Sequence, residues 1–366
     1  MKKIIILTLV LMLFGICVFA DGIDNVLNEG MKSEIENSFD YVPADIDALD
    51  LIDKLNSGDF NISTKSIFDN LKNALSTNLR ENIGFVSGIF ILVMLSALVD
   101  NIHTSFKSEK SAQFVITGIV VLGLINVTTD VTDFSVQMID RLILFINSLL
   151  PTLMTLMATS GKIGTSGILN PVMIGVSSVI TLVVKSFVVP FSVIGLSLKL
   201  TGLITDKKYL LNFGEQLYKL LKWILGLVFT VYVGIIGIIG VASPKVDEIT
   251  LKTTKYAVGS FIPYVGGMLA DSVDLILACS EVVKNSVGIA GLVGIFSIAV
   301  IPCVEIAIKV ILMNLLAVAV SPVAGKNVVD SVNSVSSCFS VLLGMMVVAS
   351  VMYILSVTVI IFVGGA

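Results

Sequence analysis

The chain has 366 residues, of which 55% are hydrophobic and 14% are charged, and its formal net charge is −4. Soluble domains carry about 25% charged residues, so this chain has too little polar surface to enclose a soluble core. The composition therefore predicts an all-α polytopic membrane protein. No basic excess is present, which argues against nucleic acid as a partner.

The N-terminus, MKKIIILTLVLMLFGICVFAD, has two lysines, a short apolar run and the small residue Ala20 before Asp21. This pattern predicts a secretory signal peptide over residues 1–20. An uncleaved first membrane helix is the alternative interpretation, although the run is short for a span. Either interpretation places residues 21–82 outside the cytoplasm.

Residues 21–82 form an acidic segment with 13 Asp and Glu against 5 Lys and Arg. Apolar residues recur at roughly helical spacing between Pro43 and Gly58, which predicts short amphipathic helices. We expect a small extracytoplasmic helical segment that caps the protein or docks a partner. A partly ordered spacer is the alternative.

Residues 83–366 form the membrane domain. Its apolar runs lie at 84–99, 112–128, 142–160, 166–184, 186–205, 223–242, 287–304, 306–320 and 339–363. Each run approaches the ~20 residues that cross a bilayer, but several are short or interrupted. Because some runs pair as half-helices, we expect about 7–9 transmembrane helices, some of them short or broken.

Charges between the runs predict the topology as far as residue 242. Asp130, Asp133 and Asp140 would lie in an outer loop, whereas Lys162 would lie inside. The segment 209–222 is amphipathic and would lie on the cytoplasmic membrane surface. After residue 242 the positive charges no longer indicate a side.

A possible internal repeat relates residues 205–229 to residues 324–348 at a constant offset of 119. Each segment follows a pair of apolar runs and precedes a long one. Duplicated halves of this kind occur in transporters, whose sites lie between the repeats. Chance similarity between hydrophobic segments is the alternative.

The stretch FIPYVGGMLADSVDLILACSEVVKNSVG, residues 261–288, is unusual in this apolar sequence. Pro263, Gly266 and Gly267 predict a helix break. In a helix over 268–285, one sector of about 80° holds four polar side chains. These are Asp271, Asp274, Glu281 and Asn285.

Three carboxylates on one stripe cannot face lipid, where one charge costs roughly 3 kcal/mol. The stripe therefore belongs either to a helix lying at the membrane surface or to a helix lining a wet path or a protein interface. Neither arrangement is catalytic.

Three further charges lie within apolar sequence and are candidate intramembrane charges: Lys185, Glu305 and Lys309. Glu305 and Lys309 have i, i+4 spacing, which predicts a local ion pair. The sequence has no P-loop motif, no HExxH and no GxSxG, and its single histidine is His103. We therefore expect no enzyme activity, no cofactor and no metal.

The order of signal peptide, acidic segment and polytopic body, followed by FIPYVGG, the Asp271/Asp274 pair and VKNSVG, resembles the stage III sporulation protein AE family. The resemblance implies a membrane component of a sporulation-specific channel or secretion-like apparatus in the mother-cell membrane around the forespore, required for forespore development. It implies ring-forming subunits, other membrane subunits and a separate ATPase as partners.

A secondary transporter or exporter with an acidic membrane-embedded site is the alternative function. The possible repeat, the break at Pro263 and the acidic stripe support it. A signal peptide and an acidic outer segment are less usual for such a carrier.

Overall fold

The computed structural model describes residues 84, 87–91, 93–94, 109–261 and 266–363. For residues 109–114, 116, 240–279 and 363 it describes only the course of the backbone. All of the named elements in this part of the chain are helices. The predicted signal peptide and acidic segment, residues 1–82, lie outside the described residues.

Six α-helices and one π-helical segment follow one another along the described chain. They are α5 (Glu109–Thr159), α6 (Ile163–Ile180), η2 (Thr181–Val188), α7 (Val189–Ile204), α8 (Lys208–Phe261), α9 (Gly266–Val320) and α10 (Lys326–Val363). Because α6, η2 and α7 are continuous, the described part has 5 helices long and apolar enough to cross a membrane. This confirms the all-α membrane class, whereas the expected count of 7–9 spans is not confirmed.

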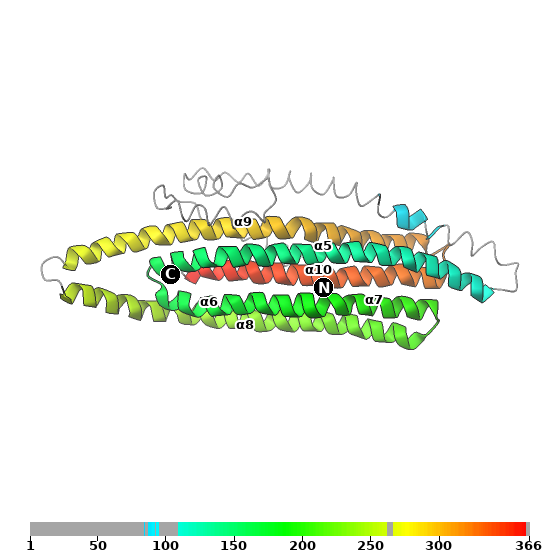
Figure 1. Ribbon diagram of the computed structural model, residues 1–366, viewed down its shortest axis with the longest axis horizontal. Coiled ribbons are helices and arrows are strands. Elements are labelled where there is room, and N and C mark those ends of the chain that lie inside the picture. Colours follow the sequence, from blue (N-terminus) through cyan, green and yellow to red (C-terminus); the bar gives the residue numbers. More distant parts are fainter. Residues whose placement is uncertain (1–83, 85–86, 92, 95–108, 262–265, 364–366) are drawn as a thin grey trace.

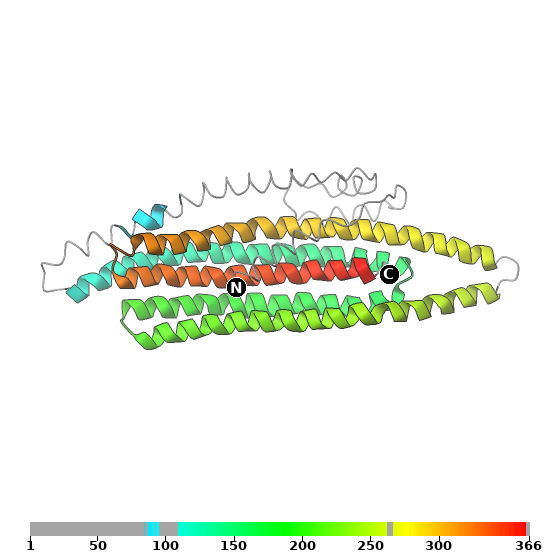
Figure 2. The same cartoon turned by 180° about the vertical axis from the view of Figure 1, so that it is seen from behind.

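The helices lie side by side in one elongated bundle (Figure 1). Helix α10 is at its centre and packs against α9, α5, α8, α7 and α6. Seen from behind, the vertical order of the helices is unchanged, with α9 above α5 and α10, and with α8 below α6 and α7 (Figure 2). The first part of α9 and the last part of α8 extend beyond the other helices at one end.

Several helix boundaries expected from the sequence are wrong. Helix α5 joins the runs 112–128 and 142–160, so the expected outer loop with Asp130 and Asp133 is part of one 51-residue helix. Helix α9 similarly joins 287–304 and 306–320. The polar residues between the runs of α5 do not break the helix because helical spacing gathers many of them on an exposed stripe, which leaves the apolar face continuous. In α9 the residue between the runs is Glu305, which pairs with Lys309 of the same helix.

The amphipathic segment 209–222 is also not a separate surface helix. It is the beginning of α8, and Tyr218 and Leu221 are buried in the bundle. The Tyr218 ring contacts Gly195 of α7. Part of the apolar face of this segment therefore packs against protein, whereas Phe213 and Leu220 are exposed.

The junction between the runs 166–184 and 186–205 is the π-helical segment η2, which contains Lys185. Pro190 follows in the first turn of α7. Proline has no amide hydrogen for the carbonyl of residue i−4 and its ring clashes with that carbonyl, so the wider π turn lets the helix continue without a kinked break.

The turn between α5 and α6 is closed by a Schellman motif. Gly161 has a φ of 84°, a conformation that glycine adopts without steric cost. The amide of Lys162 donates to the carbonyl of Met157, and the amide of Gly161 donates to that of Ala158. This turn fixes the position of Lys162 at the end of the bundle.

Candidate functional site

The predicted acidic stripe lies on the first part of α9. Asp271 and Asp274 belong to this helix, but their side chains are outside the described residues, as is Pro263. The chain leaves α8 at Phe261 and enters α9 at Gly266. Residues 266–285 are therefore the beginning of a 55-residue helix and not a separate surface helix.

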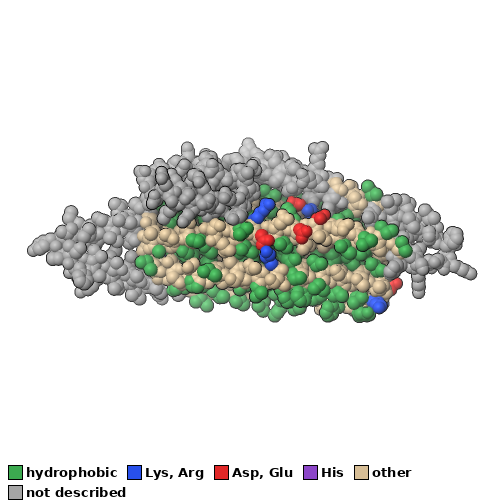
Figure 3. All heavy atoms as spheres, viewed as in Figure 1, with side chains coloured by type: hydrophobic (Ala, Val, Ile, Leu, Met, Phe, Trp, Pro, Cys, Tyr) green, Lys and Arg blue, Asp and Glu red, His purple; other side chains and the backbone are tan. Residues whose placement is uncertain are grey.

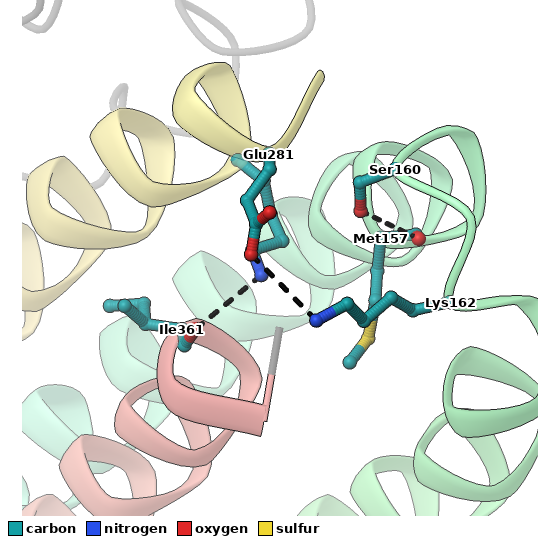
Figure 4. A network of polar contacts seen from close by, with 6 residues as sticks. Met157, Ser160, Lys162, Glu281 and Ile361 are labelled. Carbon is teal, nitrogen blue, oxygen red and sulfur yellow. Dashed lines mark hydrogen bonds and ion pairs between the residues drawn. The ribbon is translucent and has the colours of Figure 1, made fainter. Parts of the chain in front are cut away.

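Glu281 of the stripe belongs to a polar network at one end of the bundle, which we call the end network (Lys162, Glu281, Lys284 and the carbonyl of Ile361). The Nζ of Lys162 lies 3.7 Å from Oε1 of Glu281. In Figure 4 these side chains face one another between α9 and the turn that precedes α6. The ion pair therefore joins α9 to the α5–α6 turn.

Lys284, one helical turn after Glu281, is completely buried. Its Nζ donates to the carbonyl of Ile361 at 3.4 Å. Ile361 lies in the last turn of α10, where carbonyls have no partner within the helix and carry partial negative charge. The Lys284 ammonium thus caps the C-terminal end of α10, and Figure 4 shows this carbonyl next to the ion pair.

Asn285 completes the described part of the stripe. Its Oδ1 atom is buried and has no hydrogen-bond partner among the described residues. A buried acceptor without a partner costs about 1–3 kcal/mol relative to a satisfied one. The amide is thus either a defect of the isolated chain or a group that meets a ligand or partner in the assembly.

We expect Asn285→Leu to leave the free energy of unfolding of the isolated protein unchanged or to raise it by up to about 2 kcal/mol. The reason is that the substitution removes an unsatisfied buried acceptor. A detergent titration of the purified protein, followed by far-UV circular dichroism, measures this change. Asn147→Leu, at an exposed amide on α5, is the matched control. A clear loss of stability at position 285 alone would show that Oδ1 is satisfied.

A second set of charges lies midway along the bundle, and we call it the middle charges (Asp140, Lys185, Glu305 and Lys309). Lys185 donates to Asp140 at 2.6 Å, joining η2 to α5. Lys309 donates to Glu305 at 2.6 Å, as their spacing predicted, and its Nζ lies 5.4 Å from the centre of the Phe134 ring. Figure 3 shows Lys, Arg, Asp and Glu side chains gathered near the middle of this face among hydrophobic side chains, with two further charged side chains at one lower corner.

The structure thus separates the candidate residues into two places. Glu281 and Asn285 are near one end of the bundle, whereas Lys185, Glu305 and Lys309 are near its middle. The described carboxylates of both places have cationic partners. Lys162–Glu281 and Lys185–Asp140 join different elements, whereas Glu305–Lys309 lies within α9.

Three contributing residues were missed by the sequence analysis as members of these sites: Lys162, Lys284 and Asp140. Lys162 and Asp140 were expected in loops on opposite sides of the membrane. Lys284 lies in the conspicuous stretch but off the acidic stripe. Only the packing of α5 against η2 and α9 brings these cations and carboxylates together, so a periodicity argument could not pair them.

Comparison with known proteins gives the family. Residues 46–364 match the sequence profile of the family described as stage III sporulation protein AE. A relative in Bacillus subtilis (strain 168), named "Stage III sporulation protein AE", is 25% identical over 275 residues, which cover 75% of this chain and 69% of the relative. No solved structure matches the chain.

The family match spans the membrane domain and reaches into the acidic segment, so it covers both the end network and the middle charges. The chain is a multi-pass membrane protein that belongs to the stage III sporulation protein AE family.

Proposed function

We propose that this protein is a non-enzymatic membrane component of a sporulation-specific channel or secretion-like complex. It would lie in the mother-cell-derived membrane around the forespore and serve forespore development. The observation that carries the proposal is the family match over residues 46–364 in a chain whose described part is a bundle of apolar helices.

The extension formed by α8 and α9 supports a docking role within such a complex. These helices continue past the ends of α5, α6 and α10 (Figure 1). The outer parts of α8 and α9 together form a helical hairpin, and both helices carry charged residues there. These are Lys245, Asp247, Glu248, Lys252 and Lys255 on α8, and Asp271 and Asp274 on α9. A charged helical hairpin that projects beyond an apolar bundle is suited to contact other proteins.

The partners in this proposal are ring-forming subunits, other membrane proteins of the apparatus and a separate ATPase. The sequence has no P-loop of its own, so energy would come from another chain. Residues 21–82, if extracytoplasmic, would face the space between the two membranes and provide a second docking surface.

The proposal is tested with the double substitution Asp271→Asn and Asp274→Asn in sporulating cells that make this protein. We expect the variant to reach the membrane normally but to recover at least about tenfold less of the other subunits in a pull-down, a loss equivalent to about 1.4 kcal/mol. The matched control is Asp130→Asn with Asp133→Asn, which changes two exposed acids of the same spacing on α5. Intact complexes from the first variant would contradict the docking role of the stripe.

The same cells distinguish the exporter. A reporter fused to the protein should mark only the membrane around the forespore if the proposal is correct. Uniform fluorescence in growing cells, together with loss of a transport activity and no loss of partners in the Asp271/Asp274 variant, would favour the exporter instead.

A further inference from the structure

The described helices are far longer than a membrane requires. The five candidate spans have 32 to 43 residues. At 1.5 Å per residue, the longest extends about 65 Å, whereas the hydrocarbon core of a bilayer is about 30 Å thick. A single bilayer can therefore enclose only about half of the bundle. The positions of the charged residues indicate which half this is.

One half of the bundle has no charged residue on any of the described helices, and we call it the charge-free half. It comprises residues 142–161 of α5 and the turn after it, 163–184 of α6 and η2, 223–244 of α8 and 285–304 of α9. It also includes the part of α10 that packs beside these segments; α10 has no charged residue between 331 and 363. The four segments bounded by charges at both ends have 20 to 22 residues. Each is about 30–33 Å long, which is the thickness of the hydrocarbon core.

Charged residues mark both edges of this half. One edge has Arg141, Lys185, Lys222 and Glu305, and the other has Lys162, Lys245 and Lys284. At each edge an ion pair joins two elements of the bundle. The Asp140–Lys185 pair joins α5 to η2 at the first edge, and the Lys162–Glu281 pair joins the α5–α6 turn to α9 at the second.

The edges are staggered between helices. Gly291 faces Leu149 and Gly294 faces Phe145, so Glu305 of α9 lies level with Phe134 rather than with Arg141. This offset is about 10 Å at 1.5 Å per residue. Neighbouring helix axes lie about 8–10 Å apart, so an average tilt of about 20° offsets their edges by only about 3 Å. Glu305 therefore lies beyond the edge marked by Arg141, towards the other half of the bundle.

The only tryptophan of the chain lies at the first edge. Trp223 follows Lys222 directly and is exposed. Tryptophan prefers the membrane–water interface, where its ring contacts acyl chains and its N–H reaches the head groups. Its position is independent of the charges and indicates the same boundary.

The other half of the bundle carries exposed charged side chains beside its exposed apolar ones. Glu215 and Lys219 of α8 lie there with side chains 57% and 62% exposed. Asp130 and Asp133 of α5 are exposed there too. Each such charge would cost roughly 3 kcal/mol in hydrocarbon.

We propose that the lipid bilayer surrounds only the charge-free half of the bundle, between the middle charges and the end network. Asp140 and Lys185 then lie at one membrane surface, and Glu305 lies about 10 Å beyond it. The other half of the bundle projects from that surface by about 20–30 Å for α7, α8 and α9 and by up to about 50 Å for α5. The hairpin of α8 and α9 projects from the opposite surface.

The test uses single cysteines in the full-length protein, purified alone, reconstituted in lipid nanodiscs and labelled with an environment-sensitive bimane. The native Cys17, Cys279, Cys303 and Cys338 are first replaced by alanine. Two pairs of positions are matched in exposure: Leu182 and Leu122 are each 66% exposed, and Ile238 and Val318 are each 72% exposed. The first member of each pair lies in the charge-free half and the second in the projecting half.

We expect doxyl-labelled lipids to quench bimane at Leu182→Cys and Ile238→Cys at least about threefold more strongly than at Leu122→Cys and Val318→Cys. Native Trp223 should be quenched more by doxyl groups near the head groups than by groups near the bilayer centre. Equal quenching within the pairs, a reversed order, or deepest quenching of Trp223 at the bilayer centre would overturn the proposal.

Discussion

Replacing Gly294 with leucine is expected to destabilise the bundle by about 2–3 kcal/mol, the upper range for overpacking a well-packed core. Gly294 lies on a face of α9 that also presents Gly288 and Gly291, at i, i+3 and i+6. A Cβ atom at position 294 would overlap the ring of Phe145 on α5, whose side chain is completely buried. Small residues of this kind let membrane helices approach closely.

The unfolding free energy is measured by titrating the reconstituted protein with a denaturing detergent and following far-UV circular dichroism. Gly237→Leu is the matched control because nothing lies within 4 Å of a Cβ atom at that exposed position of α8. There, leucine should leave the stability unchanged or raise it by up to about 1 kcal/mol, since glycine is a poor helix former.

A double-mutant cycle with Phe145→Ala identifies the contact. Phe145→Ala alone should cost about 3–5 kcal/mol by leaving a cavity, and the combination with Gly294→Leu should cost clearly less than the sum because the leucine fills that cavity. Additive costs would show that the two side chains do not meet.

The class of the fold follows from the sequence because it depends on composition. Charges are too few for a soluble protein, and this alone predicts apolar helices. The helix break predicted at Pro263, Gly266 and Gly267 stays a prediction, since residues 262–265 lie outside the described part; α8 ends at Phe261, and Gly266 and Gly267 are the first residues of α9. The acidic stripe was expected on a helix, and α9 contains it.

The boundaries of the other helices could not be predicted from the sequence, because a charged residue within an apolar run has two explanations. Lys185 could mark a turn between two short spans or interrupt the surface of one long helix. The structure has the second arrangement, in which Asp140, 45 residues earlier in the chain, neutralises Lys185. A local sequence pattern cannot identify a partner this far away in the chain. Turns were therefore expected between apolar runs that the structure joins into one helix.

The candidate site was predictable only in part for the same reason. Glu305 and Lys309 pair within one helix, so their spacing was sufficient. Glu281 pairs with Lys162 across the bundle, and this contact depends on the Schellman turn at Gly161. Helical periodicity assigned Glu281 to the stripe but could not identify Lys162 as its partner.

Charge reversal at Lys284 is expected to have the other large effect. Lys284→Glu would place a carboxylate against the carbonyl end of α10, where Lys284 now donates to Ile361, and one turn from Glu281. All of these groups are negative, and the site is completely buried. Leaving buried charges without a counter-charge costs about 3–5 kcal/mol, so we expect little folded protein to accumulate in membranes.

Lys284→Met separates the role of the charge from that of the side-chain volume. Methionine fills a similar space but leaves the Ile361 carbonyl without this donor, so we expect a loss of about 1–3 kcal/mol, smaller than that of Lys284→Glu. The control is Lys219, which pairs with Glu215 on the exposed surface of α8. Exposed pairs contribute about 0–1 kcal/mol, so Lys219→Glu should be mild.

If Lys284→Glu were equally mild, the ammonium would not be enclosed between α9 and α10, and the end network would be open to water. If Lys284→Met were instead as damaging as Lys284→Glu, the positive charge itself would stabilise the end of α10, and the bundle would depend on it.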